Sequence, residues 1–145
     1  MFVHGGLHPD YLSLGMSVSE VNEQFRQSLG IARDKLKEVP VLNFLYGSLG
    51  PLWYRGYFRE ENGMTEVLLQ QLLTTLNVSK IVVGHTSMDG VFSHFGGRVI
   101  SVDSNIKQGK GGEILLWHAG VLQRGTMSGE QLPMRSLLEK DIQAN

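Results

Sequence analysis

Cysteine is absent from this chain of 145 residues. Its absence excludes disulfide bridges and metal sites built from thiolates, and it fits a reducing compartment. No apolar run approaches the ~18 residues that a membrane span needs. The N-terminus also lacks the basic and apolar regions of a secretory signal. The sequence therefore predicts a cytoplasmic protein that has no membrane partner.

An excess of charge of either sign is also missing. The net charge is −1 at pH 7, from 13 basic and 14 acidic side chains. No strongly basic surface is predicted, so nucleic acid is not an expected partner. The length suggests one domain, and the hydrophobic fraction of 41% supports a buried core.

Glycine is the abundant residue, with 18 copies against four prolines. Several glycines occur as pairs at predicted turns: Gly5-Gly6, Gly96-Gly97 and Gly111-Gly112. Glycine at such positions permits a positive φ or lets a ligand approach the backbone. The glycine pairs therefore indicate candidate positions for a binding site.

The first half of the chain predicts helical structure. Ser17 and Glu20 match the capping-box pattern, and apolar residues then recur every three or four positions over 18–36. Gly30 weakens the middle of this stripe, which leaves open two helices or one kinked helix. The segment 41–58 has no clean periodicity and is predicted to be a structured loop.

A second helix is predicted over 66–76, capped by Thr65 and buried by a wide apolar band. Ser128 can cap a last helix over 130–142, although a loosely attached tail is an equal alternative. Short apolar runs separated by turn residues predict strands, and these runs are 1–4, 80–84, 91–95, 98–103, 113–119 and 121–124. The order predicts an α/β fold whose later strands are antiparallel.

Two histidines share one local design. His4 and His85 each stand beside glycine where a short apolar strand ends. Ligands bind at the carboxyl ends of strands in open α/β sheets, and imidazole is a common metal ligand. The alternative is that each histidine is packed in the structure or faces solvent.

Arg55 lies between aromatic residues and glycine in GPLWYRGY, residues 50–57. A guanidinium group in such a loop suits bidentate capture of a phosphate or carboxylate. The alternative is that Arg55 stacks on Trp53 or Tyr57 and holds the loop together.

Four segments occur in a fixed order: FVHGGL at 2–7, GPLWYRGY at 50–57, IVVGHT at 81–86 and GGRVISVDSNI at 96–106. Together they resemble the C-terminal half of calcineurin-like metallophosphoesterases, in particular Shewanella-like and bacterial Ser/Thr phosphoprotein phosphatases. The resemblance runs from Phe2 to Arg124. It implies half of a two-sheet sandwich over 1–125, with a mixed sheet and flanking helices, followed by a tail over 126–145.

The resemblance also implies roles for the three residues above. His4 and His85 look like metal ligands of a two-metal centre that holds manganese, iron or zinc, and Arg55 looks like the phosphate-binding arginine. The implied reaction is hydrolysis of a phosphomonoester, on a phosphorylated protein or a small phosphoester, by metal-activated water.

The resemblance has gaps. The family's earlier motifs, which supply most metal ligands, do not occur in this sequence, and Ser87 stands where some relatives have a further histidine. Asp10, Asp89 and Asp103 are not expected to rebuild a two-metal site. His94 and His118 are expected to face solvent. A truncated half-fold would leave apolar surface exposed, which predicts an oligomer or a need for the missing N-terminal half.

Three functional hypotheses follow. The chain is the C-terminal portion of a metal-dependent phosphatase, a hydrolase that is inactive alone; or it is a non-catalytic interaction module derived from that fold; or it is an α/β domain whose motifs are structural.

Overall fold

The computed structural model describes residues 1–59, 63–109 and 111–137. The α-helices in this part of the chain are α1 (Val18–Gln27), α2 (Arg33–Glu38), α3 (Pro40–Leu45) and α4 (Glu66–Thr75). The strands are β1 (Phe2–Val3), β2 (Ile81–Val83), β3 (Phe92–His94), β4 (Val99–Ser101), β5 (Glu113–His118), β6 (Val121–Thr126) and β7 (Gln131–Pro133). Short 3-10 helices are η1 (Pro9–Leu14), η2 (Phe95–Gly97) and η3 (Ile106–Gln108).

One mixed sheet has the strand order β1-β2-β4-β3. Strands β1, β2 and β4 run parallel, and β3 is antiparallel to β4. Ile81, Val83, Val99 and Ile100 are almost completely buried in it. Continuous apolar runs of this kind are typical of parallel strands covered on both faces.

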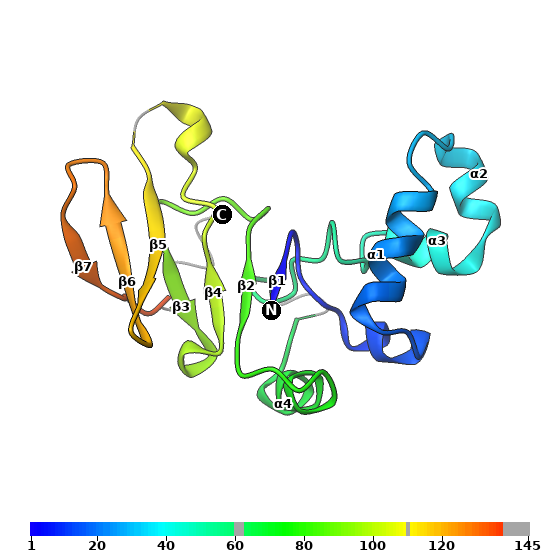
Figure 1. Cartoon of the computed structure of the whole chain (residues 1–145), viewed down its shortest axis with the longest axis horizontal. Coiled ribbons are helices and arrows are strands. Elements are labelled where there is room, and N and C mark those ends of the chain that lie inside the picture. Colours follow the sequence, from blue (N-terminus) through cyan, green and yellow to red (C-terminus); the bar gives the residue numbers. More distant parts are fainter. Residues whose placement is uncertain (60–62, 110, 138–145) are drawn as a thin grey trace.

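The second sheet is antiparallel, with the order β5-β6-β7. Figure 1 shows it at one end of the molecule, with α1, α2 and α3 at the opposite end and α4 below β1 and β2. An α/β fold with a mixed sheet and flanking helices is thus confirmed. No helix among the described residues is long and apolar enough to cross a membrane.

The helical segment divides into two helices, one of the alternatives that the sequence leaves open. Helix α1 ends at Gln27, and Gly30 has a φ of +81°, which glycine adopts more readily than other residues. Helix α2 then begins at Arg33. At the start of α1, Glu20 N donates to Ser17 Oγ, and the Glu20 carboxylate accepts from Ser17 N at 2.8 Å, so the predicted capping box is confirmed.

Ser17→Ala is expected to destabilise the fold by about 1 kcal/mol, because an orphan N–H at the start of α1 loses its acceptor. The measurement is the free energy of unfolding in urea. Ser79→Ala is the matched control, since Ser79 is exposed and makes no side-chain hydrogen bond to a described residue. An equal effect of the two substitutions would contradict a role for the cap.

Helix α4 agrees with its prediction, because Thr65 Oγ1 accepts from Leu68 N at its start and Leu69, Leu72 and Leu73 are buried. Two other predictions need correction. Helix α3 overlaps the start of the predicted loop 41–58, with Pro40 at its first helical position and with Leu42 and Leu45 buried.

The predicted helix over 130–142 is wrong for its described part, because β7 pairs with β6 there. Residues 138–145 lie outside the described part of the chain.

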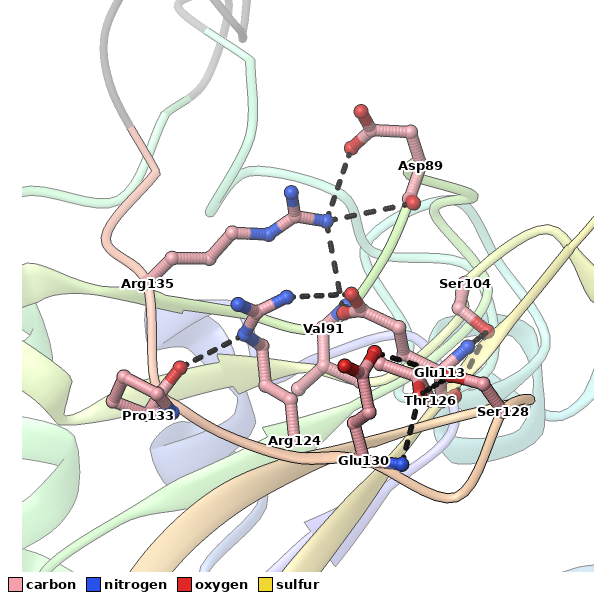
Figure 2. Close-up of polar contacts among 10 residues, drawn as sticks. All are labelled: Asp89, Val91, Ser104, Glu113, Arg124, Thr126, Ser128, Glu130, Pro133 and Arg135. Carbon is pink, nitrogen blue, oxygen red and sulfur yellow. Dashed lines mark hydrogen bonds and ion pairs between the residues drawn. The ribbon is translucent and has the colours of Figure 1, made fainter.

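A cluster of charged side chains joins the two sheets (Figure 2). Glu113 at the start of β5 contacts Arg124 of β6 at 2.5 Å and Arg135 at 3.6 Å. Its carboxylate also accepts from the backbone N–H of Val91, just before β3, at 2.8 Å. The side chains of Glu113 and Arg124 are only 14% and 12% exposed, so this ion pair is well shielded from solvent.

Candidate functional site

The two histidines meet at one edge of the mixed sheet. Strands β1 and β2 are parallel neighbours, so their carboxyl ends lie side by side, with His4 after β1 and His85 after β2 and Gly84. His4 Nε2 lies 3.1 Å from His85 Nδ1, and the ring centroids are 4.8 Å apart. The structure therefore brings together two residues that are 81 positions apart in the sequence.

His85 is held in an unusual environment. Its φ is +61°, a left-handed conformation that residues other than glycine rarely adopt. Burial lowers the pKa of His85, and the positive charge of Arg55 and the His4 ring lower it further, so the ring is neutral at pH 7. Its Nε2 atom is buried and has no hydrogen-bond partner among the described residues. Backbone strain and an unsatisfied polar atom often occur together at functional sites.

The loop that carries Arg55 packs directly on the strand that carries His4. The backbone N–H of Gly5 donates to Pro51 O at 2.7 Å. A Cβ at Gly5 would lie 2.9 Å from the backbone of Leu52 and Trp53, so only glycine fits there. Gly5 therefore leaves room for this loop, which corrects the interpretation that glycine beside His4 leaves room for a ligand.

Arg55 is half-buried, and its Nε atom is buried without a hydrogen-bond partner among the described residues. No cation–π contact of Arg55 with Trp53 or Tyr57 is found in that part of the chain, which does not support the stacking alternative. Trp53 instead sets its ring edge-on to His85, with 5.1 Å between the centroids. The Arg55 side chain thus lies near His85, and its Nε atom lacks a partner in the part of the chain that the structure describes.

Arg55 lines an open cavity of about 530 Å³. Arg33 of α2 and Arg59 line the same cavity, together with the aromatic residues Tyr46, Trp53 and Tyr54. The sequence gives no local signal for Arg33 and Arg59, because surface arginines are common and these two come from separate segments. Only the spacing of four between Arg55 and Arg59 could have suggested a link.

The other acidic candidates lie in structural contacts. Asp103 Oδ2 accepts from Ser87 Oγ at 2.9 Å, and Lys107 Nζ donates to the same hydroxyl. Asp89 pairs with Arg135 at 3.5 Å. Asp10 is exposed at the start of η1. None of the three carboxylates is seen to contact His4 or His85.

The remaining histidines also take no part in the site. His8 Nδ1 accepts from Asp10 N and caps η1. His118 is exposed, as predicted. The prediction that His94 faces solvent is wrong, because its ring stacks on Phe58 and contacts Phe95, and burial lowers its pKa.

Across residues 1–59, 63–109 and 111–137, no three side chains of His, Cys, Asp or Glu form a group that could hold a metal ion. His4 and His85 are a pair to which no described residue adds a third ligand. A resident metal centre normally needs three or more protein ligands. The predicted cofactor, manganese, iron or zinc, therefore does not fit this donor set, and that prediction is wrong.

The chain is similar to solved phosphatase structures. It shares 40% identity with a cold-active protein-tyrosine phosphatase of a psychrophilic Shewanella species, with a TM-score of 0.87 over 92% of this chain and 40% of that one. A second structure of a cold-active protein tyrosine phosphatase gives 41% identity and a TM-score of 0.85, over 90% of this chain and 38% of that one. No protein-family model matches the chain.

A curated relative is an uncharacterised protein of Schizosaccharomyces pombe, 32% identical over 114 residues. The alignment covers 77% of this chain and 33% of the relative. The chain thus spans about two fifths of the solved structures and about one third of the yeast protein.

These comparisons correct the predicted family. The similar solved structures are named protein-tyrosine phosphatases, so the predicted relationship to calcineurin-like metallophosphoesterases of the Ser/Thr type is wrong. The predictions that depended on this relationship, namely metal binding, manganese and a truncated half of a metallophosphoesterase domain, are wrong as well. The broader expectation of a phosphatase-type α/β fold agrees with the comparisons.

Proposed function

We propose that this chain carries the phosphate-binding part of a protein-tyrosine phosphatase, with Arg55 as the residue that binds the phosphoryl group. The observation that carries the proposal is the Arg55 side chain beside the histidine pair, where two parallel strands end, with a buried Nε atom that has no hydrogen-bond partner among the described residues. The 40% identity to structures named protein-tyrosine phosphatases supports the choice of substrate.

The chemistry of the proposed site follows from its donors. The planar guanidinium of Arg55 can hold two phosphoryl oxygens at once, which fixes the orientation of the group and offsets its charge. A neutral His85 can hold or move a proton at Nε2, while Nδ1 faces His4. The sequence has no cysteine, so the chain itself offers no thiolate nucleophile.

Phosphotyrosine suits the walls of the cavity better than phosphoserine. Trp53 is 52% exposed, and Tyr46 and Tyr54 line the same space, so a phenyl ring finds aromatic surface near Arg55. Burial raises the pKa of Tyr54 to about 12, which is consistent with its packing in the wall of the cavity. Aromatic pairs contribute about 0.5–1.5 kcal/mol beyond the area that they bury.

The whole chain is therefore expected to bind a phosphotyrosine peptide up to about tenfold more tightly than the same peptide with phosphoserine. The measurement is isothermal titration calorimetry in the presence of EDTA, with the unphosphorylated peptide as control. Equal affinities for the three peptides would contradict the proposal. Binding that requires added Mn²⁺ would restore the metal-dependent interpretation.

A second function is an interaction module that binds phosphotyrosine without hydrolysing it. It is favoured by the apolar surface near β1 and β5, where Phe2 and Trp117 are 75% and 72% exposed beside a cavity of about 480 Å³. Release of inorganic phosphate from the bound peptide separates the two functions. Release supports the phosphatase, and stable binding without release supports the module.

A further inference from the structure

The cavity beside Arg55 has more positive charge than one phosphoryl group needs. Three arginines line it, from three places in the chain: Arg33 at the start of α2, Arg55 in the loop and Arg59 beyond it. No aspartate or glutamate is among the described residues that line it. The positive charge is concentrated at this cavity, because the chain as a whole has a net charge of −1.

The three guanidinium groups of Arg33, Arg55 and Arg59 have no carboxylate partner among the described residues. By contrast, Arg26, Arg98, Arg124 and Arg135 all have carboxylate partners. Arginines that share an open cavity, with no neutralising carboxylate among the residues that the structure describes, favour a ligand with several negative groups.

We propose that this cavity selects phosphotyrosine flanked by acidic residues, with Arg55 on the phosphoryl group and Arg33 and Arg59 on the neighbouring carboxylates. The inference rests on the proposed function and adds the sequence context of the substrate. Arg33 and Arg59 are exposed, so they lie at the rim, where carboxylates of an extended peptide can reach them. The half-buried Arg55 lies deeper and takes the group with the highest charge.

A peptide explains the aromatic walls of the cavity as well as its charge. Trp53 and Tyr46 offer a surface for the phosphotyrosine ring, which a free phosphate would not use. Single-stranded RNA also combines rings with phosphates. The net charge of −1 is not typical of a protein that binds RNA, and it argues for a short acidic segment instead.

The test uses two phosphotyrosine peptides. One has aspartate and glutamate on both sides of the phosphotyrosine, and the other has asparagine and glutamine at those positions. The whole chain is expected to bind the acidic peptide about tenfold more tightly at low salt, as two exposed charge pairs allow. In the double variant Arg33→Gln/Arg59→Gln the two peptides are expected to bind about equally.

The matched control is Arg26→Gln/Lys35→Gln, which removes the same charge from exposed positions that pair within their own helices. This control should keep the preference for the acidic peptide, and thermal melts verify that both variants fold. If neither peptide binds the whole chain, the proposed function fails.

If both peptides bind equally to the unmodified chain, or if the control loses the preference as well, the selectivity inference alone is overturned. Competition by a short uridine oligonucleotide as strong as that by the acidic peptide would also overturn it.

Discussion

Replacing Arg55 with alanine is expected to weaken binding of a phosphotyrosine peptide by about ten- to a hundredfold, with little change in stability. A charge-assisted hydrogen bond contributes about 1.5–3 kcal/mol, and each 1.4 kcal/mol is a factor of ten in the dissociation constant. Arg55 Nε has no partner among the described residues, so its removal breaks no internal hydrogen bond there. Binding residues of this kind can therefore be lost without unfolding the protein.

Arg55→Lys separates the effect of charge from that of shape. Lysine retains the positive charge but lacks the planar fork, so it should restore only part of the affinity. Arg26→Ala is the control, because Arg26 is an exposed arginine that pairs with Glu23 on α1. Affinity for the phosphotyrosine peptide within twofold of the unmodified value in Arg55→Ala, by calorimetry, would remove Arg55 from the proposed site.

Glu113→Ala is expected to lower the free energy of unfolding by about 3–5 kcal/mol, the usual cost when one partner of a buried ion pair is removed. Glu113 is the acceptor shared by Arg124, Arg135 and the N–H of Val91, as Figure 2 shows. Its loss leaves the Arg124 guanidinium, whose side chain is 12% exposed, without a counter-charge. The change is measured by urea denaturation, with a variant that is unfolded in buffer counted as agreement.

Two further variants test whether the loss of stability comes from an uncompensated charge. Glu23→Ala removes an exposed carboxylate that also pairs with an arginine, and it should leave stability unchanged. The double variant Glu113→Met/Arg124→Met replaces both charges with apolar side chains and should lose much less stability than Glu113→Ala. If Glu113→Ala behaves like Glu23→Ala, the cluster does not hold the two sheets together.

Much of the local structure is predictable from short stretches of sequence. The capping box at Ser17 and the start of α4 at Thr65 depend on side chains within three or four residues, so their spacing is sufficient to identify them. Helix α3 is missed because its apolar residues mix with aromatic and glycine residues that continue past it. The short strand β7 is missed because only its pairing with β6 defines it.

The candidate site is predictable in part. His4 and His85 stand after apolar strands and beside glycine, and parallel pairing of those strands puts them at one edge. Their predicted role as metal ligands lacks support in the structure, because a metal site depends on a third ligand and the described residues supply none. The sequence of its loop identifies Arg55 as a candidate. Arg33 and Arg59 become candidates only in the structure, where they line the same cavity as Arg55.

Neighbouring residues are enough to predict the α/β class, the starts of α1 and α4, and the two strand ends that carry histidine. Only the folded chain shows that Gly5 makes room for the Arg55 loop, that three arginines share one cavity, and that Glu113 links the sheets. These features depend on residues that are far apart in the sequence. Contacts between residues tens of positions apart depend on topology and packing, which local propensity and periodicity do not encode.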